Sequence, residues 1–214
     1  MSNEENKLKF ESLVRKIRRD GADIDGFLSM LESSDFYSAP ATTQFHWSFE
    51  GGLCEHTMDV YDQLVKQVST HHGSVENSPY SQDTLILVAI SHDLYKINFY
   101  NKYVKNEKVY SPIGKKSDEM GRFDWVSSSA YKIADVNKRF VLGTAEENSL
   151  YIAQGFFPLS VEESSAILNN KTYKDSADSG QMISFEKYPL SLYLYVSDMI
   201  STFLHGNEQG WNNQ

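Results

Sequence analysis

The most apolar run of the chain, Leu85 to Ile90, leads directly into three polar residues, Ser91, His92 and Asp93. A segment that is apolar on every side predicts a helix enclosed by the rest of the protein, and we expect this helix to extend from Gln82 to about Lys96. A buried carboxylate is costly unless it is paired, hydrogen-bonded or bound to a metal ion. The chain therefore needs a core that surrounds one helix and a polar partner for the end of that helix.

Two other segments carry a polar side chain of the same kind inside an apolar pattern. In a helix expected from about Leu53 to Val68, His56 lies one turn before the apolar Val60, so its imidazole points to the buried side. In a last helix, expected from about Pro189 to Leu204, Asp198 is the only charged residue. Each such residue taken singly is more often a satisfied structural group. Two imidazoles and two carboxylates on three apolar helices together favour a divalent metal site.

The remaining pattern indicates one domain over 1–214, because 214 residues and 24.4 kDa suit a single core. We expect a helical N-terminal segment over 1–37, a core over about 38–205 and a loose tail over 206–214. Ser160 followed by Glu163 predicts a capping box at a helix start. Further helical patterns lie at Leu8–Ile17, Ile24–Leu31, Ala145–Gly155 and Val161–Asn169.

One stretch, about 98–137, departs from the helical pattern. Its β-branched and aromatic residues, broken by glycines and charges, predict an irregular insertion with a possible β-hairpin. The aromatic residues Tyr103, Tyr110 and Trp125 suit either packing within a hairpin or stacking on a nucleobase. The expected fold class is an all-α helical bundle that carries this insertion.

Charge and cysteine content narrow the function. There are 20 Lys and Arg against 29 Asp and Glu, and the formal net charge of -9 disfavours a non-specific grip on a nucleic-acid backbone. A single cysteine, Cys54, rules out an internal disulfide framework and a multi-cysteine zinc site. The basic residues near the N-terminus form either a short basic patch or a solvated helix face; they are Arg15, Lys16, Arg18 and Arg19.

The sequence also bears on location. It contains no run of 18 apolar residues, so we expect no membrane-spanning helix. The acidic, polar first residues do not fit a secretory signal. Together with the lone cysteine, these features predict a reducing, cytoplasmic setting.

The order of the candidate ligands resembles the HD-domain phosphohydrolase superfamily. The stretch GGLCEHT at 51–57 is similar to the family's Gly-Gly-Leu-x-Glu-His-Ser/Thr segment, whose histidine is the first metal ligand. The stretch LVAISHDLYK at 87–96 is similar to the family's helix end with His-Asp and a following Lys. Residues 188–199 resemble the terminal helix that supplies the last Asp. The resemblance covers about 45–204 and is nearest to short stand-alone HD proteins of bacteria and their viruses, close to the HD-domain exoribonucleases.

This resemblance implies an all-α bundle with a metal at its centre and hydrolysis of phosphate esters or nucleoside triphosphates. One divalent ion (Mn, Fe, Co, Ni, Zn or Mg) would be held by His56, His92, Asp93 and Asp198. Asp93, or a water network near it, would take the proton. Lys96, at the family's Lys position, would hold a substrate phosphate oxygen near the metal rim.

Other histidines give weaker signals. His46 precedes the Gly-Gly turn by a short loop and suits either an acid or phosphate-binding role in the metal cleft, or packing between its aromatic neighbours. His71, His72 and His205 fall in a polar loop or in the tail and are expected at the surface.

The chain also departs from the family. Binuclear members carry two more histidines, and Thr144 and Asn170 stand at those positions here, while Glu146 falls on the family's Glu. No histidine lies between Ile97 and Met199, so a second histidine-bound metal is not expected.

Three functions follow from the sequence. The first is a metal-dependent phosphohydrolase that acts on a small nucleotide or a short nucleic acid. The second is a degenerate HD module that binds metal and nucleotide with little turnover. The third is an oligomeric structural protein whose polar core pairs only with itself. The sequence leaves the oligomeric state open.

Overall fold

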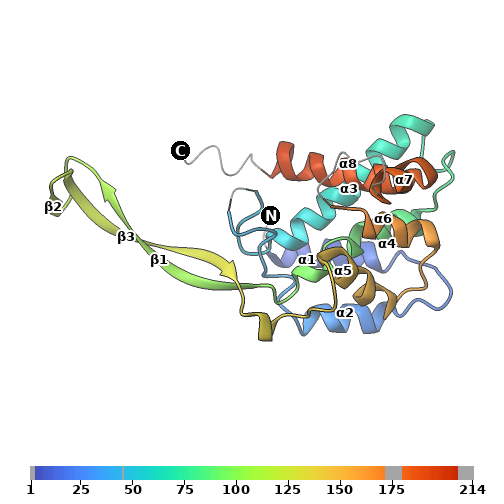
Figure 1. The fold of residues 1–214 in the computed structure, drawn as a ribbon, viewed down its shortest axis with the longest axis horizontal. Coiled ribbons are helices and arrows are strands. Elements are labelled where there is room, and N and C mark those ends of the chain that lie inside the picture. Colours follow the sequence, from blue (N-terminus) through green and yellow to red (C-terminus); the bar gives the residue numbers. More distant parts are fainter. Residues whose placement is uncertain (1–2, 45, 172–179, 207–214) are drawn as a thin grey trace.

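The protein has a helical body from which a long β-arm projects (Figure 1). The structure, a computed structural model, describes residues 3–44, 46–171 and 180–206, and 52% of it is helical. None of the described helices is long and apolar enough to cross a membrane. The α-helices are α1 (Asn3–Val14), α2 (Ile24–Glu32), α3 (Gly52–His72), α4 (Gln82–Ser91), α5 (Ala145–Gln154), α6 (Val161–Leu168), α7 (Gly180–Lys187) and α8 (Pro189–Ile200); the short helices are η1 (Leu94–Lys96), η2 (Val136–Lys138) and η3 (Ser201–His205).

Helix α4 lies between two apolar clusters, as its sequence predicts. Each side chain of Leu85–Ile90 is at most 1% exposed. Leu87 and Ile90 join a cluster with residues of α1, α2 and α5, whereas Leu85 and Val88 join a cluster with residues of α3, α6 and α8. Full burial of each such side chain is worth about 1.5–3 kcal/mol. The prediction of a buried central helix is therefore confirmed.

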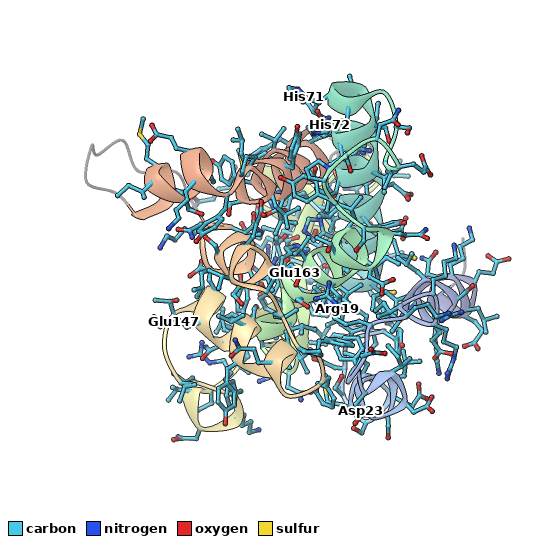
Figure 2. All side chains as sticks on the ribbon, turned by 90° about the vertical axis from the view of Figure 1, so that its right-hand side faces the viewer. Arg19, Asp23, His71, His72, Glu147 and Glu163 are labelled. Carbon is cyan, nitrogen blue, oxygen red and sulfur yellow. The ribbon has the colours of Figure 1, made fainter. Side chains whose placement is uncertain are left out.

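Two helix ends differ from the predicted ones. Helix α4 ends at Ser91, and the chain reaches Lys96 through the tighter turn η1. Helix α3 continues to its end at His72, so His71 and His72 belong to its last turn and not to a loop (Figure 2). Gly73 ends α3 with a φ of 85°, a conformation that glycine adopts without strain. The sequence pattern does not predict α7.

The predicted insertion is a regular antiparallel ribbon. β1 (Tyr100–Tyr110) pairs with β3 (Gly121–Ile133), and the short β2 (Lys116–Asp118) adds to β3 near the tip. The mostly helical fold with a hairpin insertion is confirmed, but the protein is not purely all-α, because the insertion forms a small antiparallel sheet. The two long strands satisfy each other's backbone groups, and this outweighs the charged residues that interrupt the apolar pattern.

A buried ion pair joins the N-terminal segment to α6. Arg19 Nη2 lies 2.5 Å from Glu163 Oε1, and the Glu163 side chain is 2% exposed. Glu163 also accepts a hydrogen bond from the backbone N–H of Ser160, which completes the predicted capping box. Arg15 pairs with Asp25 on α2. These two arginines of the N-terminal basic group therefore serve in ion pairs within the fold.

We expect Glu163→Gln to destabilise the protein, because glutamine keeps the cap but leaves Arg19 without its charge partner. The loss should be about 2–3 kcal/mol, less than for a fully enclosed pair because Arg19 is partly exposed. Burial raises the pKa of Glu163, but the hydrogen bonds from Arg19 and Ser160 outweigh it and hold the pKa below the ordinary 4.5. The Glu163 charge therefore contributes its full stabilisation above about pH 4.5. This contribution is lost as the pH falls through the lower pKa that Glu163 has in the folded protein. Denaturant titrations from about pH 3 to pH 7 measure both effects.

Helix α5 offers a matched control. Glu147 has the same capping-box position there, with Thr144 as the cap, and Glu147 is exposed (Figure 2). Glu147→Gln should change stability by no more than about 0.5 kcal/mol. Equal losses in the two variants would show that the cap, and not the ion pair with Arg19, carries the effect.

Candidate metal centre

Three helices bring the predicted ligand residues together. His56 lies in the second turn of α3, His92 and Asp93 follow the end of α4, and Asp198 lies in the last turn of α8. Helix α3 packs against both α4 and α8. His56 and His92 are each only 2% exposed. The inward orientation that the sequence predicts for His56 is confirmed.

Two ring nitrogens and two carboxylate oxygens converge at this point. His56 Nε2 lies 3.4 Å from His92 Nε2, 3.4 Å from Asp93 Oδ2 and 3.2 Å from Asp198 Oδ1. His92 Nε2 lies 3.3 Å from Asp93 Oδ2. The ligand atoms of His56, His92 and Asp93 all lie within 4.8 Å of one another, so this group could hold a metal ion. Asp198 adjoins this group through His56, and its part as a ligand stays a prediction.

Outer contacts orient both imidazole rings. His92 Nδ1 lies 2.7 Å from the carbonyl oxygen of Ala89, and a carbonyl only accepts, so Nδ1 carries the hydrogen. The Nε2 lone pair of a neutral His92 then faces the centre. His56 Nδ1 lies 3.0 Å from Ser201 Oγ, which likewise leaves its Nε2 turned inward. Lone pairs and carboxylate oxygens that face one another need a cation between them, either a proton or a metal ion.

The charges at the centre are fixed by their neighbours. Burial raises the pKa of Asp198, but the His56 hydrogen bond outweighs it and lowers the pKa to about 2. Burial also opposes ionisation of Asp93, yet the Lys96 ammonium, 2.6 Å from Asp93 Oδ2, holds that pKa well below its usual range. For His56, burial lowers the pKa, and its contacts with Asp198 and Asp93 raise it more. Both carboxylates are therefore ionised at neutral pH, Asp93 beside Lys96 and Asp198 beside His56.

A cavity of about 320 Å³ opens beside these residues. Asn170 Nδ2 donates to Asp198 Oδ2 over 3.0 Å at its wall. Among the described residues, Asn170 Oδ1 is buried without a hydrogen-bond partner, as expected of an atom that awaits a ligand or water. The cavity is lined by His92, Asp93, Tyr95, Lys96, Glu146, Asn170, Lys171, Tyr195, Asp198, Met199, Thr202 and Phe203.

The remaining predicted residues differ in their position relative to the cavity. Glu146 and Asn170 line the cavity, whereas Thr144 is exposed and caps α5. His46 is half-buried and contacts the ring of Phe203, a residue of the cavity wall, at 5.9 Å between centroids. Burial, followed by the nearby charges of His56 and Lys96, lowers the pKa of His46. His46 is not part of the described cavity wall, so its role in catalysis stays a prediction.

Cys54, on the same helix as His56, is buried and free, as the sequence predicts. Burial, reinforced by the negative charge of Glu55, raises the pKa of the Cys54 thiol to about 12. The thiol is therefore protonated at neutral pH, and Cys54 packs as a small apolar residue.

The sequence pattern missed a wide turn that follows α8. Ser201 continues the α-helical conformation of α8, one turn after Asp198, and its hydroxyl contacts His56; from Ser201 to His205 the helix widens to the π-turn η3. Trp47 Nε1 donates to the Ser201 carbonyl over 3.1 Å, and Trp47 itself has a φ of 51°. Gly206, predicted to begin the loose tail, is buried, and a Cβ there would lie 2.7 Å from Trp47 Nε1. The rest of the predicted tail, 207–214, lies outside the described residues. The sequence signal that could have indicated the contact with His56 is the position of Ser201, one helical turn after Asp198.

We expect Ser201→Ala to weaken metal binding about tenfold, because the hydroxyl orients the His56 ring and outer partners of metal ligands typically contribute that much. Ser197 is the matched control: it is equally buried on α8, but its hydroxyl donates to the carbonyl of Tyr193. Ser197→Ala should leave metal affinity within about twofold. Titration of the apo-protein with Mn²⁺ or Zn²⁺ by calorimetry measures both. Equal affinities in the two variants would show that Ser201 does not act on the centre.

Comparison with known proteins gives no match. No family model, no curated protein and no solved structure is similar to this chain. The candidate centre is therefore defined by its own geometry: two inward imidazoles, two ionised carboxylates and a lysine beside a cavity.

Proposed function

We propose that the chain is a metal-dependent phosphohydrolase of the HD type, which cleaves a phosphate ester or anhydride of a nucleotide or short nucleic acid. The observation that carries this proposal is the convergence of two imidazole nitrogens and two carboxylate oxygens beside a cavity lined by lysine. The sequence contexts of these residues resemble the HD superfamily and support the same function.

The donor set fits one divalent ion. His56, His92, Asp93 and Asp198 offer nitrogen and oxygen ligands, a mixture that suits Mn, Fe, Co, Ni or Zn better than Mg, which prefers oxygen alone. When bound, such an ion would lower the pKa of a water and polarise a phosphoryl oxygen. Asn170 would keep the Asp198 carboxylate in place through the hydrogen bond to Oδ2.

The cavity wall supplies the other groups that phosphate hydrolysis needs. Lys96 lines the cavity and would bind a phosphoryl oxygen as negative charge develops there. Asp93 would accept the proton, as an ionised carboxylate can. Tyr195 and Phe203 offer aromatic faces to a base. A volume of about 320 Å³ is near the lower end for ligand pockets and suits a mononucleotide or one chain end.

A second candidate is a self-contained polar core without metal or turnover. It is favoured by the Lys96 contact with Asp93 Oδ2, the same oxygen that faces both imidazoles. With His56 protonated, the charges of Lys96 and His56 would balance those of Asp93 and Asp198. A degenerate module that binds without turnover is the third candidate, consistent with the place of Thr144 away from the cavity.

The test is metal content and turnover on one purified sample. Elemental analysis should find one transition metal per chain. A panel of nucleoside mono-, di- and triphosphates and short oligonucleotides should show hydrolysis with Mn, Co, Ni or Mg. His92→Ala and Asp198→Ala should each lower bound metal by at least about tenfold. Unchanged metal content in both variants would contradict the assignment of His92 and Asp198 as metal ligands. Bound metal without hydrolysis would support the binding module.

Lys96→Met tests the phosphate-binding role, because methionine keeps the packing of the side chain and removes its charge. We expect turnover to fall about 30- to 1000-fold, the range for loss of one oxyanion-stabilising group. Metal content should not fall, because protonated Lys96 is not a ligand and its loss removes a competing cation. Lys102, an exposed lysine that pairs with Glu50, is the control, and Lys102→Met should leave turnover within about twofold. Unchanged turnover in Lys96→Met would place the substrate elsewhere.

A further inference from the structure

We propose that the β-arm, residues 100–133, docks on the helical body of a second copy of this chain. Figure 1 shows the arm extending well beyond the body. An isolated two-stranded ribbon in water is marginally stable at best. Eleven residues of β1, at about 3.3 Å each, give the arm a reach of roughly 36 Å, which is enough to span a small domain.

The arm exposes apolar side chains that a free ribbon would not need. Nine of the 22 large apolar side chains that are exposed among the described residues belong to it. Ile113 and Met120, both near the tip, are the two most exposed of these, at 87% and 81%. Four of the nine share one face of the ribbon in the strand register, and apolar side chains gathered on one exposed face mark an interaction site. Exposed Ile, Met and Val suit a protein surface better than a phosphate backbone.

The strand register shows which face would make the contact. Residues opposite one another in β1 and β3 share a face. One side, the aromatic face, carries Val104, Tyr110, Phe123, Trp125 and Tyr131. The opposite side places an acidic residue beside an apolar one in two successive pairs, Glu107 with Val126 and Asp124 with Val109. Aromatic residues are enriched in protein–protein interfaces and acidic ones are depleted, so the aromatic face is the docking face.

Charge complementarity identifies the partner as this same chain. The arm contains seven basic and four acidic residues, a net charge of +3. The whole chain carries -9, so the remainder carries -12. A basic arm and an acidic body attract one another, and two copies related by a twofold axis can satisfy both contacts at once. The same negative body would repel a nucleic acid.

The open edges of the arm argue for contact through the face and not by strand addition. β1 is an edge strand and carries Lys102, Lys105 and Lys108. Lysines on an edge oppose pairing with another strand. Lys108 also lies over the rings of Phe123 and Trp125, at 4.5 and 5.8 Å from their centroids, and pairs with Asp118 on β2.

Sedimentation equilibrium of the full chain, over a range of concentrations and salt, tests the proposal with two neighbouring substitutions. Trp125 on the aromatic face and Val126 on the opposite face are 50% and 46% exposed, so both variants should fold. We expect a wild-type dimer that weakens as salt rises. Trp125→Asp should raise the dimer dissociation constant at least about thirtyfold, as for a central aromatic contact, and Val126→Asp less than about threefold.

A wild-type protein that stays monomeric at low salt would overturn the proposal, as would equal weakening by the two substitutions. A monomer that binds a short oligonucleotide through Trp125 would also overturn it, and would make nucleic acid the partner. Metal content and turnover are measured separately on the same samples. The docking result therefore does not depend on whether the phosphohydrolase proposal holds.

Discussion

The cost of enclosing a charge at the end of an apolar helix governs the arrangement of the body. Asp93 follows α4, whose side chains are buried on every side, so the carboxylate is largely enclosed and meets only the cavity beside it. The tight turn η1 brings Lys96 into an ion pair with Asp93. His56 and His92 approach the same carboxylate oxygen from α3 and from the end of α4. Helix α8 then adds a second carboxylate, Asp198. A cluster with two anions and inward lone pairs is stable only with cations inside it.

The positions of the outer partners show how the fold supports this cluster. At the end of α8, the Ser201 hydroxyl contacts His56, and the Ser201 carbonyl accepts a hydrogen bond from Trp47. Three residues of a regular α-helix advance about 300°, so Ser201 lies within about 60° of Asp198 around the helix. The same face of α8 therefore supplies both Asp198 and Ser201 to the His56 ring.

The body and the arm follow different physical rules. The body buries its apolar residues in two clusters and keeps its charges in ion pairs such as Arg19 with Glu163. The arm satisfies its backbone groups between two strands but leaves side chains such as Ile113 and Trp125 in water. A protein seldom leaves this much apolar surface on an extended element without a binding partner. The opposite charges of arm and body favour the body of a second copy as that partner.

The sequence by itself determined the buried helix and the inward face of His56, because apolar periodicity and the cost of a buried charge are local properties. It also predicted a hairpin near residues 98–137, but not its regularity, because glycines and charged residues interrupt the apolar pattern there. Only the tertiary structure placed Asn170 on Asp198 and Ser201 on His56, contacts between residues 28 and 145 positions apart. It likewise decided that Thr144, the cap of α5, lies outside the cavity. No local pattern encodes such contacts, because they depend on how whole helices pack.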